Sequence, residues 1–326
     1  MRKMYRISLL PVLLFLMLAL FSAEAFAMGM VKMTMKVVDE DGKPVEGAEV
    51  QFCTFGGCLK KNVITGITDS NGNYSIFKYS IDGVIGGAVK KAGYYYSVFH
   101  RDFRTTTLGM YRPWNKEKKV VLRPKIKPVP MYVRNKWVQI PVLDKEIGLD
   151  LEKFDWVAPY GLGTKADFIF KITCRYNTID DFDTKMTMTF SNKFDGIQKM
   201  VTDRGGDFGV GSIMRLPRYA PETGYAPKLE SGLTSGPERN ILTETISNYF
   251  FRVRSEVDEK GNLVRAMYGK IAGDVDVATG AVDGIVTNRI YFKYYLNPDY
   301  TRNLEYDTQA NLFSPIPRGE TRVGDP

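Results

Sequence analysis

Two aspartates that alternate with valine in the C-terminal half of the chain are the first candidates for chemistry. In residues 273–276 a β-strand would place the carboxylates of Asp274 and Asp276 on one face, because side chains alternate between the two faces of a strand. Two like charges at that spacing repel, so the pattern favours either a bound cation or plain exposure to water. Oxygen ligands suit calcium, and Asp274 and Asp276 are therefore where the sequence suggests a calcium ion, with no other cofactor expected.

A second acidic group, Asp180, Asp181 and Asp183, lacks the pattern of a calcium loop. An EF-hand needs a glycine within a twelve-residue loop and a glutamate at its end, and neither is found here. Acidic residues are common in turns because they accept local backbone hydrogen bonds, so we interpret this group as a solvated turn. The glycine-rich stretch 205–211 likewise lacks the Lys-Ser/Thr pair and the helix of a phosphate-binding loop.

Histidine-based catalysis and metal binding are limited, because His100 is the single histidine of the chain. One histidine cannot form a multi-histidine zinc site, and a place beside Arg101 and Asp102 at a strand end favours an ordinary surface residue. No Ser-His-Asp or Cys-His arrangement is available to the C-terminal half. A glycosidase needs two carboxyl groups at a defined separation, which a sequence does not show. We therefore predict no catalytic residues; the alternative is a carbohydrate-active enzyme with a carboxylate-based site in the second domain.

Aromatic side chains offer another route to ligand binding, since flat apolar rings stack on sugars and on protein partners. Strand alternation places Tyr95 on the face opposite to its two tyrosine neighbours, so at least one ring of this run faces solvent. Residues 155–163 lead from a strand into a glycine-bearing turn and contain Trp156 and Tyr160. The predicted ligand surface is therefore Tyr95, Trp156 and Tyr160, with Trp137 as a further aromatic of this kind. The alternative is that these rings fill sandwich cores.

Cys53 and Cys58 bracket a short turn-prone link between two extended segments. Facing positions near the end of a hairpin meet disulfide geometry, so we predict a bond between them in an oxidising compartment. The closed loop is short, and chain entropy gives the bond about 2 kcal/mol of stabilisation. Two free thiols are the alternative, and the spacing is not that of a Cys-x-x-Cys redox or metal pair. Cys174 has no partner by count and is interpreted as a buried structural thiol.

The first residues have the three parts of a bacterial signal peptide. A basic start with Arg2, Lys3 and Arg6 precedes an apolar run over residues 7–21, and small residues at positions 25 and 27 form the signal-peptidase pattern. We predict a signal peptide over residues 1–27, with an uncleaved N-terminal anchor as the alternative. A membrane-spanning helix needs about twenty apolar residues, which neither this run nor any later segment provides.

Export narrows the range of partners. The formal net charge is +8, and residues 1–27 contribute three basic side chains and one acidic one, which leaves about +6 for the mature chain. That charge is spread along the sequence instead of clustered as nucleic-acid binding requires, so no nucleic-acid partner is expected. We expect a secreted or periplasmic protein, with cell-surface association as an option, no transmembrane segment in the mature chain, and envelope proteins or polysaccharides as partners.

Short runs of Val, Ile, Thr, Tyr and Phe, separated by Gly, Asn, Asp and Pro, predict strands throughout the chain and almost no helix. Residues 30–38 alternate between apolar and polar, and an Asp-Gly turn follows them. Seven such short strands precede residue 123, which is the pattern of a β-sandwich.

Three motifs in this region, taken together, resemble the carboxypeptidase regulatory-like domain. They are Val-Asp-x-Asp-Gly-Lys-Pro-Val-x-Gly-Ala-x-Val at 38–50, Thr-Asp-x-Asn-Gly-x-Tyr-x-Ile at 68–76, and Lys-Ala-Gly-Tyr at 91–94. The resemblance covers about residues 30–123. It implies a prealbumin-like, seven-stranded β-sandwich that serves as an accessory module and has no reaction of its own. The loop bracketed by the two cysteines is longer than the usual connection of that family.

The prolines of residues 124–131 favour an extended linker, so we place the domain boundary there. Residues 28–123 are the predicted first sandwich, and residues 132–313 a second β-rich sandwich or jelly-roll-like domain of no recognised family. Residues 204–241 interrupt its strand pattern, and residues 314–326 are predicted to be a flexible tail. The fold class is all-β. As a whole, the sequence predicts an exported, non-catalytic interaction or structural protein that binds protein or polysaccharide ligands.

Overall fold

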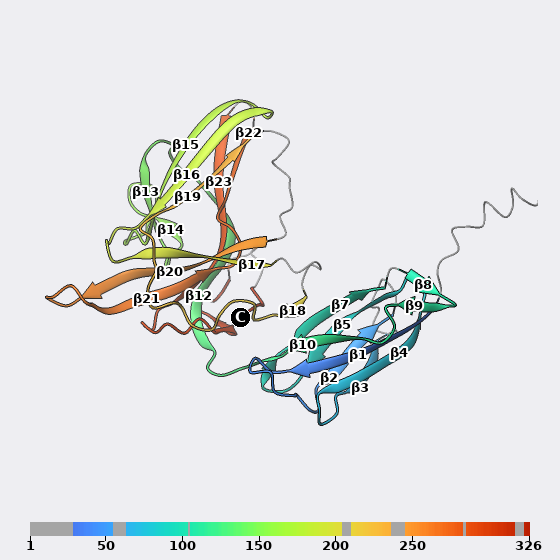
Figure 1. Ribbon diagram of the computed structural model, residues 1–326. Helices are drawn as coiled ribbons and strands as arrows, with labels where there is room; N and C mark the ends of the chain where they lie inside the picture. Colours follow the sequence, from blue (N-terminus) through green and yellow to red (C-terminus); the bar gives the residue numbers. More distant parts are fainter. Residues whose placement is uncertain are drawn as a thin grey trace, which may run out of the picture. The chain divides into compact units, whose positions relative to one another are not determined.

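The computed structural model is all-β, as the sequence predicts, and separates into two compact units (Figure 1). It describes residues 29–54, 63–103, 105–203, 210–235, 245–282, 285–316 and 323–326. Of these, unit 1 takes the residues up to Pro124 together with 210–212, and unit 2 takes the rest. No helix in these ranges is long and apolar enough to cross a membrane. The predicted signal peptide and Cys58 lie outside the described residues.

Unit 1 contains two five-stranded sheets and an additional two-stranded pair. The strands of the first sheet are β1 Gly29–Val38, β4 Asn73–Ser80, β8 Thr105–Thr107, β9 Met110–Arg112 and β10 Lys116–Val121. In this sheet β1 pairs antiparallel with β4 and parallel with β10. β1 also pairs with β9, and β9 pairs with β8. The second sheet has the order β18 (Gly211–Ser212), β7 (Ser97–Asp102), β5 (Val84–Lys90), β2 (Glu49–Cys53) and β3 (Ile64–Ile67). Separately, β6 (Tyr94–Tyr95) pairs with β11 (Arg123–Pro124).

The alternation predicted for the first strand sets the core of unit 1. Every second residue of β1 is buried, beginning with Val31 and Met33, and these side chains pack against residues of the second sheet such as Val50 and Phe52. Two turns that begin with aspartate close the flanking strands. Asp39 accepts hydrogen bonds from the backbone N–H groups of residues 41 and 43, and Asp69 does the same for residues 71 and 73. The β-sandwich predicted from these turns is therefore confirmed.

Unit 2 is also built from two sheets. The larger has the order β17-β20-β21-β23-β12-β24, with β22 paired to β23; its strands are β12 Val129–Gln139, β17 Gly196–Asp203, β20 Thr245–Val257, β21 Leu263–Ile271, β22 Asp276–Val282, β23 Ile285–Asn297 and β24 Tyr306–Asn311. The smaller has the order β14-β13-β15-β16-β19, with β13 Glu146–Asp150, β14 Asp155–Trp156, β15 Phe168–Thr178, β16 Asp181–Thr189 and β19 Leu229–Thr234.

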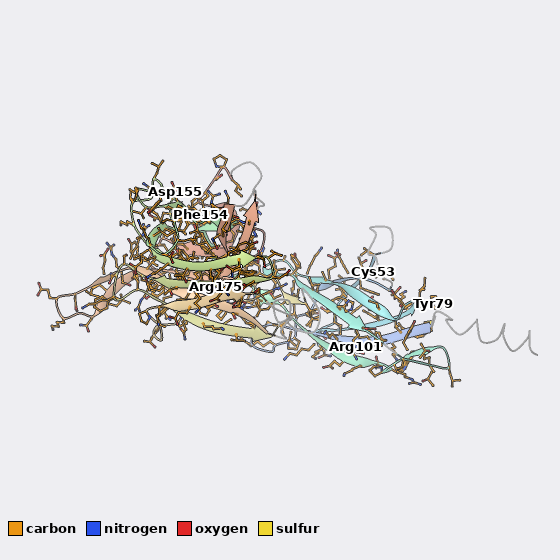
Figure 2. All side chains as sticks on the ribbon, turned by 90° about the horizontal axis from the view of Figure 1, so that it is seen from above. Cys53, Tyr79, Arg101, Phe154, Asp155 and Arg175 are labelled. Carbon is orange, nitrogen blue, oxygen red and sulfur yellow. The ribbon has the colours of Figure 1, made fainter. Side chains whose placement is uncertain are left out.

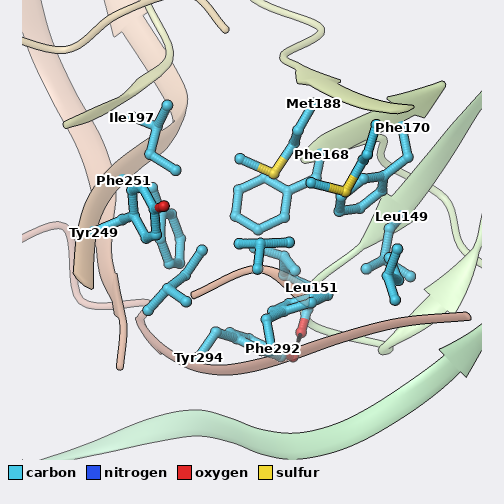
Figure 3. Close-up of a cluster of buried hydrophobic side chains, with 14 of the residues drawn as sticks. Leu149, Leu151, Phe168, Phe170, Met188, Ile197, Tyr249, Phe251, Phe292 and Tyr294 are labelled. Atoms are coloured by element: carbon cyan, nitrogen blue, oxygen red, sulfur yellow. Dashed lines mark hydrogen bonds between the residues drawn. The ribbon is translucent and has the colours of Figure 1, made fainter. Parts of the chain in front are cut away.

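Aromatic rings fill the main core of unit 2 (Figure 3). The ring centroid of Phe168, on the smaller sheet, lies 5.0 Å from that of Phe251 and 6.1 Å from that of Phe292, both on the larger sheet. The Tyr294 hydroxyl donates a hydrogen bond to the Leu151 carbonyl oxygen at 2.5 Å, so this buried polar group is paired. Each such ring contributes about 1.5–3 kcal/mol by leaving water, and together these contacts join the two sheets into one sandwich.

Two predicted segments differ in detail from the structure. The units divide after Pro124, at the start of the expected linker. The expected linker, residues 124–131, overlaps β12, because Val129 and Met131 are buried in a hydrophobic cluster. Pro130 is tolerated there since the pairing of β12 with β23 begins only at Tyr132. The expected flexible tail, residues 314–326, ends in packed residues. Val323 is 6 % exposed, and the Asp325 carboxylate lies 2.7 Å from the Lys293 Nζ.

Candidate functional site

The predicted ligand residues belong to two different units. Tyr95 lies on β6 of unit 1, whereas Trp156 and Tyr160 belong to unit 2. Tyr95 and Trp156 are 5 % and 6 % exposed, so the interpretation of these rings as core residues describes them better than that of an open surface. Tyr160 is 37 % exposed on the turn after β14. Two of the three rings are therefore buried and one is partly exposed. The sequence does not predict this difference, because it does not show which face of a strand packs against another sheet.

A pocket does open at one edge of unit 2, beside one of these residues. Its volume is about 490 Å³, and its walls are Lys136, Trp137, Val138, Gln139, Pro141, Phe154 and Trp156. Five of the seven come from β12 and its continuation, Phe154 comes from the turn that joins β13 to β14, and Trp156 comes from β14. Aromatic rings and proline dominate the lining, while Lys136 supplies an ammonium group and Gln139 an amide.

The backbone direction of β12 explains why the pocket forms here. The Ile140 N–H donates to the Asn288 carbonyl oxygen, so the even-numbered residues of this stretch direct their backbone groups toward β23. The odd-numbered residues therefore direct theirs to the other edge, where the Gln139 carbonyl oxygen accepts a 3.0 Å hydrogen bond from the Trp156 indole. β24 pairs with β12 only as far as Met131, and no other described strand pairs with that edge.

Trp137 is the most exposed ring of the pocket, at 40 %. Its ring centroid lies 5.2 Å from that of Tyr291, its cross-strand partner on β23. The guanidinium carbon of Arg289 lies 5.4 Å from the same ring, within the range of a cation–π contact. The Tyr291 hydroxyl in turn donates to Asn135 Oδ1 at 2.6 Å. Trp137 is thus held by neighbours on the sheet while much of its surface faces solvent.

Phe154, on the β13–β14 turn, is another aromatic residue of the pocket lining. Figure 2 labels it next to Asp155. The Phe154 φ of 52° is in the left-handed region, which costs free energy in a residue other than glycine and needs support from its surroundings. The ring stacks on Tyr294, with centroids 5.7 Å apart, and the Arg134 guanidinium carbon lies 5.4 Å from it. Asp155 accepts hydrogen bonds from the N–H groups of Trp156 and Leu162, both at 2.8 Å, and so fixes the turn on its other side.

A buried ionic network anchors that turn to the larger sheet. Arg254, 10 % exposed, lies in a bulge of β20, and its guanidinium donates to both carboxylate oxygens of Asp167 at 2.8 Å, to Asp150 at 3.1 Å, and to Glu152. Burial alone would raise the pKa of Asp150, but backbone N–H donors, first that of Thr164, hold it below its ordinary value. Burial raises the pKa of Asp167 despite the opposing Arg254 charge.

The predicted calcium residues do not line the pocket. Asp274 accepts a hydrogen bond from the Tyr249 hydroxyl at 3.1 Å, and Asp276 begins β22 opposite Tyr291. Burial raises the pKa of Asp276, and the neighbouring Asp274 charge adds to the shift. Within the described ranges, no group of three or more His, Cys, Asp or Glu side chains is placed to hold a metal ion. Calcium at these two residues stays a prediction.

The acidic turn at residues 180–183 has local partners. The Asp181 carboxylate accepts hydrogen bonds from Arg175 at 2.9 Å and Asn177 at 2.8 Å, and these bonds lower its pKa. Both members of the Arg175–Asp181 ion pair are more than half exposed. This is the solvated turn that the sequence indicates.

Of the two cysteines predicted to form a disulfide, the structure describes one. Cys53 ends β2, is 2 % exposed, and has its Sγ 3.5 Å from the Gly86 carbonyl oxygen, while Cys58 lies outside the described residues. Cys174 is a free thiol that accepts a hydrogen bond from the Thr184 hydroxyl at 3.3 Å, and it is half-buried, not fully buried as the sequence indicates.

Sequence reasoning named Trp137 and Trp156 among the available aromatics but missed Phe154, which completes the pocket. The missing information is the register of β12 against a turn from the other sheet, which no local pattern contains. A hint exists in the alternation of β12, whose odd positions are buried from Val129 to Val133 and become exposed at Trp137.

Comparisons with known proteins identify no family. No family model matches the chain, and no curated protein does. Hydroxyquinol 1,2-dioxygenase from Pseudomonas putida is 12 % identical, with a TM-score of 0.23, over 30 % of this chain and 57 % of its own. The chain therefore spans a little over half the length of that enzyme. The shaft pilin spaA from Lactobacillus rhamnosus GG is 13 % identical over 79 % of this chain and 92 % of its own, with a TM-score of 0.24. A DUF3823 family protein from Parabacteroides merdae is 8 % identical over 69 % and 90 %, with a TM-score of 0.21. Matches this distant carry no argument about function.

Proposed function

We propose that the protein is an exported, non-catalytic binding protein of the periplasm or cell surface, and that unit 2 holds a polysaccharide in the pocket at the edge of β12. The observation that carries this proposal is the arrangement of Trp137, Phe154 and Trp156 around one opening. Aromatic faces suit the apolar faces of sugar rings, and the polar groups of Lys136 and Gln139 suit their hydroxyls. A volume of about 490 Å³ lies within the range of small-ligand sites.

A polysaccharide fits this pocket better than a peptide strand does. A peptide strand would pair with the free edge of β12, and the exposed Lys136 opposes this, because charged side chains on an edge strand discourage further strand pairing. The absence of a carboxylate among the residues that line the pocket supports binding without hydrolysis, since glycosidases use a pair of carboxyl groups. A carbohydrate-active enzyme remains the rival function.

A binding screen with a parallel turnover assay separates the two functions. The mature chain would be titrated with uncharged hexasaccharides of glucose, N-acetylglucosamine and mannose while tryptophan fluorescence is recorded, and each mixture would then be assayed for new reducing ends. We expect a saturable fluorescence change with at least one sugar and no new reducing ends. Release of reducing ends at a rate that scales with protein concentration would establish the enzyme instead.

Export also has a direct chemical consequence for the cysteines. We expect the mature, unreduced protein to bind one equivalent of a thiol reagent in denaturant, because Cys174 is free and Cys53 is proposed to pair with Cys58. Reduction before labelling should raise the count to three, the number of cysteines in the chain. Mass spectrometry of labelled peptides gives the count, and three reactive thiols without reduction would exclude the bond. Loss of residues 1–27 in the same spectrum would show the predicted cleavage.

A further inference from the structure

Unit 1 has a second surface that the proposed function does not use, on the outer face of its first sheet. The even-numbered residues of β1 lie on this face, since the odd-numbered ones are buried in the core. The register places Lys32 opposite Phe77 of β4, and Lys36 opposite Lys119 of β10. Three lysines and an aromatic therefore share one face of three adjacent strands.

Large aromatic side chains are exposed on this face although no described element covers them. Phe77 is 55 % exposed, and Tyr79, two residues further along β4, is 47 % exposed. Figure 2 labels Tyr79 on unit 1. The Phe77 ring meets the ring of Trp114 edge to face, with centroids 5.9 Å apart. Trp114 precedes β10, on the other side of β1, so this pair spans the strand that carries Lys32. Exposed rings that contact one another on a sheet face indicate a binding surface.

This face carries a net positive charge, which favours an anionic ligand. Lys32, Lys36 and Lys119 provide three ammonium groups, against the single carboxylate of Glu117, which shares the face opposite Thr34. Within the described residues, no ion pair engages Lys32 or Lys119, and the Lys36 Nζ donates to a backbone carbonyl. Positions 32 and 36 are four residues apart on a strand, a separation of about 13 Å. Lys32 and Lys36 thus lie along β1, Lys119 lies beside Lys36 on β10, and the aromatic rings lie at the Lys32 end of this face.

We propose that this aromatic–lysine face, formed by Lys32, Lys36, Lys119, Phe77, Tyr79 and Trp114, binds an anionic polysaccharide. Sugar rings stack on the aromatic side chains, and carboxylate, phosphate or sulfate groups along the polymer contact the lysines. The site is separate from the pocket of unit 2 and does not depend on it. A rigid sheet face with aromatic rings beside charges suits a polymer that carries both rings and charges better than it suits a lipid surface, which offers charges alone.

Binding assays on the mature chain test this proposal with dextran sulfate and polygalacturonate as probes, and uncharged dextran as the neutral comparison. We expect both anionic polymers to bind with an association constant whose logarithm falls linearly with the logarithm of salt concentration, whereas dextran held by the unit 2 pocket would show no such salt dependence. The double variant Lys32→Glu/Lys119→Glu should weaken binding at least tenfold, and Phe77→Ser should weaken it about fivefold with an unchanged salt slope.

A charge-matched control keeps the test specific. Lys199→Glu/Lys260→Glu changes the net charge by the same amount at exposed positions of unit 2, and it should leave binding within twofold of the parent protein. Equal losses in the two double variants would overturn the proposal, because they would show a general effect of net charge. Binding to vesicles of anionic phospholipid but to neither anionic polymer would overturn it in favour of a membrane surface. Unchanged thermal unfolding of each variant shows that the fold is retained.

Discussion

Replacing Arg254 with methionine is expected to lower the free energy of unfolding of unit 2 by about 3–5 kcal/mol, because the change leaves buried carboxylates without their cation. Asp150 and Asp167 are each 2 % exposed and both contact this guanidinium. Methionine has a similar length and, like arginine, a Cβ atom, so the left-handed backbone conformation at φ 55° costs about the same in both proteins. Urea unfolding followed by tryptophan fluorescence measures the change, since two of the three tryptophans lie in unit 2.

The pH dependence of this loss identifies its cause. Burial already raises the pKa of Asp167, and without Arg254 nothing as strong opposes that shift. A carboxyl group whose pKa is higher in the folded state than in the unfolded chain destabilises the fold above that pKa and ceases to do so when it is protonated. The deficit of the variant should therefore be largest at pH 7 and smaller at pH 5. A deficit that is equal at both pH values, or below about 1 kcal/mol, would contradict the buried-network account.

The matched control for this variant is Arg265→Met on the neighbouring strand β21. Arg265 pairs with Glu256 at 2.7 Å, but both side chains are 51 % exposed. Solvent screens such a pair, so its loss should change stability by about 0–1 kcal/mol. The contrast between the two arginines separates the effect of burial from the mere loss of an ion pair.

Replacing Trp137 with alanine is expected to reduce the affinity of unit 2 for its polysaccharide by about tenfold to a hundredfold, since a stacked ring at the centre of a site contributes about 1–3 kcal/mol. The fold should tolerate the change, because Trp137 is 40 % exposed and lies near the end of β12. Isothermal titration with the best sugar from the screen gives the affinity. Thermal unfolding of the same variant should fall within a few degrees of the parent protein.

The control for this variant is Tyr160→Ala. Tyr160 has a similar exposure, 37 %, and follows Trp156 closely in sequence, but it does not line the pocket. Its replacement should change affinity less than threefold. A larger loss for Tyr160 than for Trp137 would favour the surface predicted from the sequence over the pocket found in the structure.

Local patterns in the sequence carry much of the fold. The alternation of residues 30–38 predicts both the strand β1 and its buried face, and the aspartate turns before residues 43 and 73 close its neighbours as expected. These features depend on side chains within a few residues of one another, so they can be predicted from the sequence alone. The units divide at the start of the predicted linker, but the linker is shorter than predicted, because proline content marks extended chain and an extended chain is also what a strand end requires.

The candidate site depends instead on partners distant in the chain. The bond from the Trp156 indole to Gln139 spans 17 residues, and the contacts of Arg254 with Asp167 and Asp150 span 87 and 104 residues. Such pairs follow from the register and packing of two sheets, which no local pattern encodes. The same holds for the aromatic–lysine face of unit 1, where Phe77 and Trp114 lie on opposite sides of β1.

The most direct test of the central claim is an NMR titration that follows the three tryptophan indole N–H signals of the mature chain as the uncharged sugar is added. The pocket predicts that the Trp137 and Trp156 signals shift and saturate together at one dissociation constant, while the Trp114 signal of unit 1 stays in place. Saturable binding that leaves the Trp137 signal unmoved would contradict the claim that unit 2 holds its ligand at the edge of β12.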